Sequence, residues 1–265
     1  MTRRGDERPV AIITGASGGL GSATARALAA QGYHLVLMSR GGCGDIAAET
    51  GGVGVAGSVL NDVDVDRAVA TALDTFGRLD AAVFGAGRHS EVMKGYEVPA
   101  APPATRDSFN YDPEYTREIF DIPWPAWHDD YEMMVIAPMR LAKAVLPHLK
   151  VSGRGSFVAI SGIEAGQPRV PFPLGPTRLA IQGFIKLLAD RHGPENIRFN
   201  TVAPGLMESA KTEFHPDWAG TVPLGRVGRN EEVGQTIAFL LSDVASYITG
   251  QCITVDGGVN RPLGL

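Results

Sequence analysis

Residues 14–21 read TGASGGLG, and this stretch decides the fold. It directly follows the apolar run Val10–Thr14 and opens the segment Gly21–Gln31, whose apolar residues recur with a helical period. Glycines are needed where a backbone turns tightly and where it must come close to a pyrophosphate. The N–H groups of the first helical turn and the helix dipole then face the anion. Strand, glycine turn and helix in this order predict a nucleotide-binding unit, and the alternative is a tight turn without a ligand.

Apolar runs and helical segments alternate along the rest of the chain. The runs expected to form buried strands are Val10–Thr14, His34–Ser39, Val53–Gly57, Asp80–Gly85, Gly155–Ser161, Arg198–Val202 and Cys252–Val255. The segments with a helical period are Gly21–Gln31, Asp45–Thr50, Asp64–Phe76, Trp127–Leu149, Arg178–His192 and Glu231–Ser242. This alternation predicts an α/β fold of the doubly wound Rossmann type, in which helices cover both faces of a seven-stranded, mostly parallel sheet. We expect residues 1–265 to form one dinucleotide-binding domain, because no internal repeat and no linker interrupts the pattern.

Two stretches are expected to cover the site. Residues 88–123 form a long insertion that is rich in proline and aromatic residues. Loops of this length are uncommon in compact domains and often act as lids, although a surface excursion is the simpler alternative. A second lid is expected at about residues 206–228. Together the two stretches suggest a bulky, partly apolar small-molecule substrate.

Composition excludes several function classes. The chain has a net charge of −5 and no basic tract, so a nucleic-acid partner is not expected. The only cysteines, Cys43 and Cys252, have no metal-ligand spacing, so we expect neither a metal site nor a disulfide framework. The apolar stretch after the charged N-terminus is too short for a signal peptide or a membrane span. These features predict a cytoplasmic protein.

Further motifs accompany the glycine turn, whose spacing is G-x-x-x-G-x-G after a threonine. They are Phe76-Gly77-Arg78-Leu79-Asp80, Phe84-Gly85-Ala86-Gly87, Leu146-Pro147-His148, Asn200-x-Val-x-Pro204-Gly205 and Gly250–Gly258. In these motifs the chain resembles the short-chain dehydrogenase/reductases over almost its whole length. The resemblance implies a Rossmann-type fold, a dinucleotide cofactor, a small-molecule substrate and a homotetramer or homodimer.

The resemblance also implies which residues bind the cofactor. They are Gly15, Ser17, Gly18, Gly19, Leu20 and Gly21 in the turn, Ser58, Val59, Ala86 and Gly87 after two later strands, and Arg178, Pro204, Gly205 and Ser209. In that family an aspartate usually lies beside the adenine, and Ser58 takes its place here.

The end of the second strand bears on the choice of nucleotide. It reads Ser39-Arg40. An acidic residue there would accept hydrogen bonds from the ribose 2′-hydroxyl of NAD, whereas an arginine can pair with a 2′-phosphate. We therefore predict NADP(H) rather than NAD(H), and the alternative is a solvated surface arginine. Gly18 weakens this prediction, because NADP-preferring relatives often carry a second basic residue at that position.

The family's catalytic Asn, Ser, Tyr and Lys are the positions at which this chain departs from the pattern. Gly183–Ala189 resembles the interior of the catalytic helix, and counting back from it puts Arg178 at the Lys position and Leu174 at the Tyr position. Met134 takes the Asn position. The Ser position is Ser161 by its distance from residue 174, or Gly162 by the local strand motif. Leucine cannot carry a proton, and a positioned general acid is worth roughly 10²–10⁴-fold in rate.

Other residues are candidates for the missing proton donor. His89 follows the fourth strand, at the edge where ligands of open α/β sheets bind, and histidine titrates in the right range. Glu164 follows the fifth strand and could face the same cleft. For both, a loop residue without a role is the alternative. We expect Ser161 to donate a hydrogen bond to a substrate oxygen, and Arg178 to act as an electrostatic clamp because it stays protonated.

Three functions fit these observations. The first is an NADP(H)-dependent oxidoreductase with a non-standard active site, reducing an imine or an activated enone rather than a simple ketone. The second is a non-redox enzyme, such as an isomerase, cyclase, lyase or dehydratase, that keeps the nucleotide as a scaffold. The third is a non-catalytic nucleotide-binding protein, because fold alone does not separate these classes.

Overall fold

The computed structural model describes residues 8–87, 118–166, 175–210 and 216–260. All seven predicted strands are present, and all six strand pairings are parallel. In chain order the strands are β1 (Val10–Thr14), β2 (His34–Ser39), β3 (Val53–Ala56), β4 (Ala81–Phe84), β5 (Ser156–Ile160), β6 (Arg198–Pro204) and β7 (Cys252–Val255). Their order across the sheet is β3-β2-β1-β4-β5-β6-β7, which confirms the doubly wound fold.

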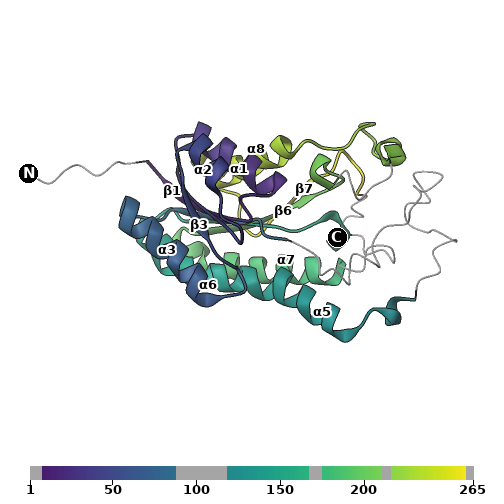
Figure 1. Cartoon of the computed structure of the whole chain (residues 1–265), viewed down its shortest axis with the longest axis horizontal. Coiled ribbons are helices and arrows are strands. Elements are labelled where there is room, and N and C mark those ends of the chain that lie inside the picture. The colour runs from purple at the N-terminus through teal and green to yellow at the C-terminus, as the bar shows by residue number, and fades with distance from the viewer. Residues whose placement is uncertain (1–7, 88–117, 167–174, 211–215, 261–265) are drawn as a thin grey trace, which may run out of the picture.

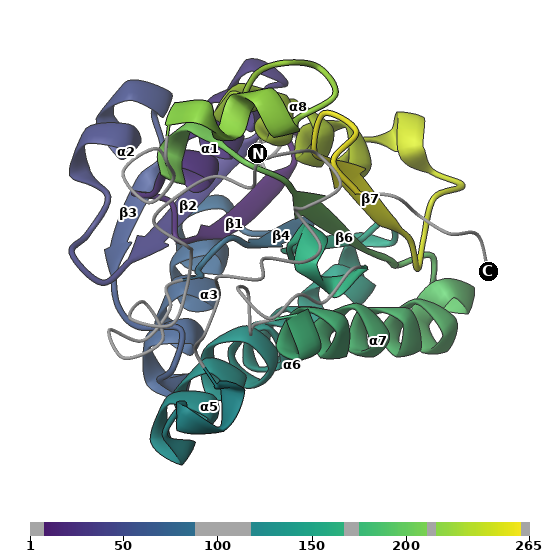
Figure 2. The same ribbon diagram turned by 90° about the vertical axis from the view of Figure 1, so that its right-hand side faces the viewer.

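Helices cover both faces of this sheet, as Figures 1 and 2 show. On one face lie α1 (Gly19–Ala30), α2 (Gly44–Thr50) and α8 (Asn230–Leu241). On the other lie α3 (Asp62–Phe76), α6 (Ala137–Ser152) and α7 (Gly175–His192). Each face has its own buried apolar cluster, because strands buried on both sides send alternate side chains into opposite layers.

The long helix before β5 differs from the prediction. It begins as α5 (Trp124–Tyr131), three residues before the predicted start, and continues through a π-helical turn, Glu132–Ile136, into α6. The early start has a local reason, since Pro125 lies in the first turn, where a missing N–H costs nothing. A π-helical turn often lies at a functional site, and this one contains Met134.

Strand ends also differ by one or two residues. The prediction ended the sixth strand at Val202, whereas β6 continues to Pro204. Its extension pairs with β7, since Ala203 lies opposite Thr254 and Pro204 opposite Val255. The extra pairing carries the backbone to Gly205, at the edge where the site lies.

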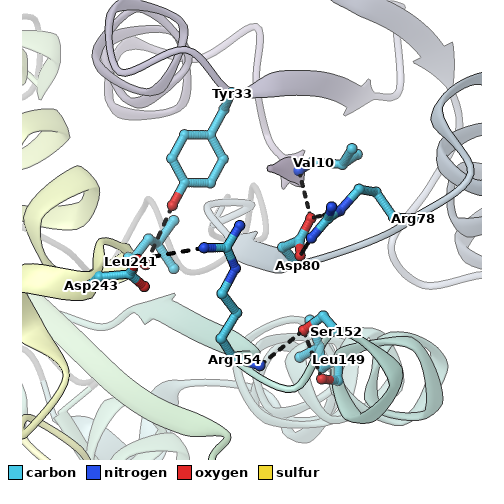
Figure 3. Close-up of polar contacts among 9 residues, drawn as sticks. All are labelled: Val10, Tyr33, Arg78, Asp80, Leu149, Ser152, Arg154, Leu241 and Asp243. Atoms are coloured by element: carbon cyan, nitrogen blue, oxygen red, sulfur yellow. Dashed lines mark hydrogen bonds and ion pairs between the residues drawn. The ribbon is translucent and has the colours of Figure 1, made fainter. Parts of the chain in front are cut away.

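The amino-terminal edge of the sheet is closed by paired polar groups (Figure 3). The Asp80 carboxylate accepts two hydrogen bonds from Arg78, at 2.8 and 2.6 Å, and one from the Val10 N–H at 2.9 Å. Tyr33 donates to the carbonyl of Leu241, and burial raises the pKa of its hydroxyl. A cleft of about 270 Å³ at this edge is therefore lined by acids and bases that already have partners.

Candidate nucleotide-binding and active site

The glycine turn forms a cradle that side chains would fill. Gly15 has a φ of +66°, and a Cβ atom there would lie 2.5 Å from the carbonyl oxygen of Gly85. A Cβ atom on Gly21 would overlap the carbonyl oxygen of Gly15. Helix α1 begins after Gly18 without a side-chain cap, so its first N–H groups face the cleft. Backbone amides at a helix start, with no side chain in the way, are what a pyrophosphate needs.

The turn opens onto a cleft of about 380 Å³ at the carboxyl ends of the strands. The cleft lies where the strand order reverses between β1 and β4, the position at which open α/β sheets bind ligands. The predicted residues that line it are Gly15, Ser17, Gly18, Ser39, Arg40, Ser58, Val59, Ala86 and Gly87. Lining residues that the sequence did not single out are Met38, Gly41, Gly57, Leu60, Gly85 and Met133. The residues present fit a dinucleotide.

The remaining predicted cofactor residues are not among those that line the cleft. A Cβ atom on Gly19 would lie 2.5 Å from Ser209 Cβ, so the segment after β6 packs directly on the glycine turn. A Cβ atom on Gly205 would lie 2.7 Å from Asp256, next to the end of β7. In the described structure Gly19 and Gly205 are therefore needed for close packing. Leu20, Gly21 and Pro204 also lie outside the cleft lining.

The side chains at the second strand end have different surroundings. Arg40 is exposed, and within the described part of the chain no hydrogen bond or ion pair engages it. The Ser39 hydroxyl, in contrast, donates to the carbonyl of Gly42 and accepts from Cys43, which holds the turn. Arg40 therefore remains available to a ligand, whereas Ser39 supports the backbone.

The third strand end is organised by Asp64. Its carboxylate accepts the Ser58 N–H at 2.9 Å and a hydrogen bond from Arg67 at 2.7 Å. Both hydrogen bonds lower the pKa of the Asp64 carboxyl, and the bond from the Ser58 N–H contributes more than the bond from Arg67. The turn that carries Ser58 and Val59 is thus fixed before any nucleotide binds.

Arg178 lies at the opposite end of the cleft, in the first turn of α7. Its Nη1 donates to the backbone carbonyl of Ser161 at 3.1 Å. A Cβ atom on Gly87 would lie 3.9 Å from Arg178 Nη1 and 3.7 Å from the methyl carbon of Met134. The structure therefore brings together the residues at the Lys and Asn positions, at the ends of β4 and β5.

Ser161 and Gly162 follow β5, and their environments differ. Ser161 is buried, and its hydroxyl donates to the carbonyl of Arg178 at 3.1 Å and accepts from Gln182 at 3.0 Å. The Ser161 hydroxyl proton is thus used in a hydrogen bond within the protein, rather than facing a ligand. Gly162 is the residue next to the guanidinium, because a Cβ atom there would lie 3.5 Å from Arg178 Nε. In the described structure it is thus Gly162, rather than Ser161, that lies beside the Arg178 side chain.

Glu164, which the sequence offered as a candidate proton donor, lies close to Gly162. It lies in the short 3₁₀ turn Ile163–Ala165, and its carboxylate folds back over Gly162. A Cβ atom on Gly162 would overlap Glu164 Oε2, so the carboxylate occupies the space that a serine side chain would take. Its position three residues after the strand was the only signal in the sequence. His89 and Leu174 lie outside the described residues.

The described part of the second lid is tied to α8. Met207 pairs with Gly228, and the carboxylate of Glu208 accepts the Asn230 N–H at 3.0 Å. Leu206 and Val222 pack with Ile163 in a small buried cluster. The lid base therefore contacts the turn that carries Glu164.

Glu232 anchors this base, and we predict that the anchor weakens in acid. Hydrogen bonds from Arg226 and from the Arg229 N–H lower the pKa of the Glu232 carboxyl from 4.5 to about 2. A depressed pKa means that the stabilisation is present above pH 4.5 and is lost as the pH falls towards 2. Since these side chains are partly exposed, Glu232→Gln should lower the free energy of unfolding by less than about 1 kcal/mol at neutral pH. Urea unfolding of both proteins should show this difference shrinking in acid, and a pH-independent difference would contradict the assignment.

Neither a membrane helix nor a metal cluster is found in the described residues. No described helix is long and apolar enough to cross a membrane. No group of three or more His, Cys, Asp or Glu side chains in the described ranges could hold a metal ion.

Comparison with known proteins agrees with this geometry. A family model described as enoyl-(acyl carrier protein) reductase matches residues 15–101 and 108–260. The human dehydrogenase/reductase SDR family member 4 is 32% identical over 274 residues, covering 97% of this chain and 90% of that protein. The 3-oxoacyl-[acyl-carrier-protein] reductase of Thermotoga maritima is 30% identical over 267 residues, covering 96% and 98%. The 3-ketoacyl-(acyl-carrier-protein) reductase of Brucella melitensis, solved with NADH, superposes with a TM-score of 0.82 at 25% identity, covering 96% and 98%.

Proposed function

Because this chain belongs to the short-chain dehydrogenase/reductase family, we propose that it is an NADP(H)-dependent oxidoreductase that reduces an imine or an activated enone. The observation that carries the proposal is the position of Arg178. Its guanidinium lies beside Gly87 at one end of the cleft, while the residue at the Tyr position is Leu174. We therefore infer a site that keeps a cation for the cofactor and that has a leucine at the position of the usual proton donor.

A bound reduced nicotinamide supplies a hydride. In this chain the glycine turn and the start of α1 bind the pyrophosphate, Arg40 binds the 2′-phosphate, and Arg178 binds the ribose next to the nicotinamide. An arginine is a poor general acid, so Arg178 orients the cofactor and balances charge but moves no proton. The NADH complex of the Brucella melitensis relative supports a nicotinamide cofactor here.

The missing tyrosine restricts the choice of substrate. Ketone reduction produces an alkoxide that must be protonated, and a positioned acid contributes about 3–5 kcal/mol to that step. An iminium carbon accepts a hydride without creating an anion, and an activated enone spreads the charge over more atoms. Met133 lines the cleft as an apolar residue, which suits a bulky, partly apolar substrate.

Two measurements test this function. Fluorescence titration with NADPH and NADH should show that the protein binds the dinucleotide, and failure to bind either would remove the oxidoreductase proposal. The absorbance of NADPH at about 340 nm should then fall during turnover of a cyclic imine. Product formed without NADPH consumption would instead favour a non-redox enzyme on the same scaffold.

Replacing Arg40 should reverse the nucleotide preference. Arg40→Ala removes charge-assisted hydrogen bonds to the 2′-phosphate, each worth about 1.5–3 kcal/mol, so the Kd for NADPH should rise about tenfold to a hundredfold. The Kd for NADH, which has no 2′-phosphate, should change little. Arg191→Ala, at an exposed arginine in the last turn of α7, is the matched control. Equal weakening of both nucleotides would show that Arg40 does not read the phosphate.

We also propose a homotetramer or homodimer. Exposed apolar side chains on α5 and α7 support it, namely Trp124, Leu179 and Leu187, with exposed fractions of 74%, 52% and 67%. Large apolar groups left exposed on helices often belong to protein interfaces.

A further inference from the structure

Two groups of opposite charge converge on the space above Gly162. Glu164 Oε2 would overlap a Cβ atom on Gly162, and Arg178 Nε lies 3.5 Å from the position of that atom. The glycine makes this arrangement possible, since any side chain there would push the carboxylate away. Gly162 and Gly87 both lie beside the same guanidinium, and Gly87 also lines the nucleotide cleft. The carboxylate therefore lies at the end of the cleft where hydride transfer is expected.

Neither group is fully satisfied by the protein around it. Arg178 Nε is buried and has no hydrogen-bond partner among the described residues. Within the same described ranges, no hydrogen bond or ion pair engages the Glu164 carboxylate. A buried or half-buried polar group without a partner is costly unless a ligand provides one. A carboxylate in this state offers acceptors to N–H donors.

We propose that Glu164 binds the protonated nitrogen of an imine substrate and keeps that nitrogen protonated; this inference rests on the proposed reductase function. A negative charge within about 4–6 Å favours the cationic form of a titratable group by about 1–3 pKa units. The hydride adds to the iminium carbon, and the π electron pair moves onto nitrogen. The iminium cation and the hydride thus give a neutral amine and oxidised cofactor. The nitrogen proton comes from solvent before the hydride arrives.

The same charges argue against the enone. Hydride addition to an enone creates an enolate, and a carboxylate nearby would raise the energy of that anion. The Arg178 guanidinium keeps its charge although its Nη1 donates to the Ser161 carbonyl, and it offsets part of this repulsion. With Arg178 beside it, Glu164 makes the local charge close to neutral, so that a cation can enter. The apolar Met133, which lines the cleft, suits the hydrocarbon part of the substrate.

Binding of an amine and its uncharged isostere tests the proposal without turnover. The probes are 1,2,3,4-tetrahydroisoquinoline, which is cationic at neutral pH, and isochroman, in which oxygen replaces the N–H group. Isothermal titration calorimetry should show that the wild-type protein with NADP⁺ binds the amine about tenfold to a hundredfold more tightly than isochroman, because a charge-assisted hydrogen bond is worth about that much. Glu164→Gln should abolish the preference while leaving isochroman and NADPH binding unchanged.

A matched variant and a second readout make the outcome decisive. Glu231→Gln removes a carboxylate from an exposed position in the first turn of α8 and should keep the preference. With 3,4-dihydroisoquinoline as substrate, Glu164→Gln should lower kcat/KM, and the loss should grow as the pH rises above neutrality, where an unassisted imine loses its proton. A preference retained in Glu164→Gln, or no preference in the wild-type protein, would overturn the proposal. A Glu164-dependent preference in a protein that binds no dinucleotide would keep this site and remove the reductase function.

Discussion

A variant that carries G162S, E164A, L174Y and R178K should gain reduction of a simple ketone and lose reduction of an imine. Tyrosine supplies the proton that an alkoxide needs, and a lysine beside it lowers the tyrosine pKa from about 10 towards neutrality. Serine at residue 162 supplies a hydrogen bond to the substrate oxygen. A general acid contributes roughly 10²–10⁴-fold, and we expect the lower end because Met134 still replaces the asparagine. NADPH consumption with ethyl acetoacetate and with 3,4-dihydroisoquinoline measures both changes.

The design of this variant depends on Gly162 and Glu164. A double variant with only L174Y and R178K would keep Gly162, and the Glu164 carboxylate would still fill the space that a serine side chain at residue 162 needs. We therefore expect the double variant to gain much less ketone reduction than the quadruple variant. The matched control is the quadruple variant with L174F in place of L174Y, which keeps the aromatic ring and removes the hydroxyl. Equal ketone reduction by the Tyr and Phe proteins would show that residue 174 is not the proton donor position.

The sheet and the nucleotide cleft could be predicted from sequence because their signals are local. Buried parallel strands appear as short apolar runs, and every predicted run forms a strand of the sheet. The position of the glycine turn follows from the strand before it and the helix after it, β1 and α1. Arg40 likewise follows directly from the end of β2, and it lines the cleft as expected.

The catalytic end was harder to predict because its geometry depends on side-chain direction. Ser161 and Gly162 are neighbours in the sequence, yet the serine hydroxyl donates to the Arg178 carbonyl while the glycine lies next to the guanidinium. Consecutive residues of an extended chain point to opposite sides, so a shift of one residue exchanges their roles. Glu164 reaches the site only because Gly162 has no side chain. Counting residues within a motif cannot show that a side chain missing at one position leaves space for the side chain of another.

Gly21→Ala should strongly weaken nucleotide binding, because the glycine turn has no room for a side chain at this position. Its Cβ atom would overlap the Gly15 carbonyl oxygen and would lie 2.9 Å from Ala16 Cα. Both neighbours are backbone atoms, so no side chain can rotate away. Gly15 cannot retreat either, because it already packs against the Gly85 carbonyl. Helix α1 must therefore shift away from the turn, and overpacking of this kind costs typically 1–3 kcal/mol.

The shift of helix α1 should also disrupt the pyrophosphate site, because the N–H groups at the start of the helix would move away from the cleft. We expect the Kd for NADPH to rise by at least about tenfold, with the lower free energy of unfolding measured separately in urea. Gly183→Ala is the matched control, since a Cβ atom there meets nothing within 4 Å and the residue lies inside α7. It should stabilise the protein by up to about 1 kcal/mol and leave NADPH binding unchanged. Wild-type affinity in Gly21→Ala would mean that residues 14–21 are a structural turn rather than the dinucleotide cradle.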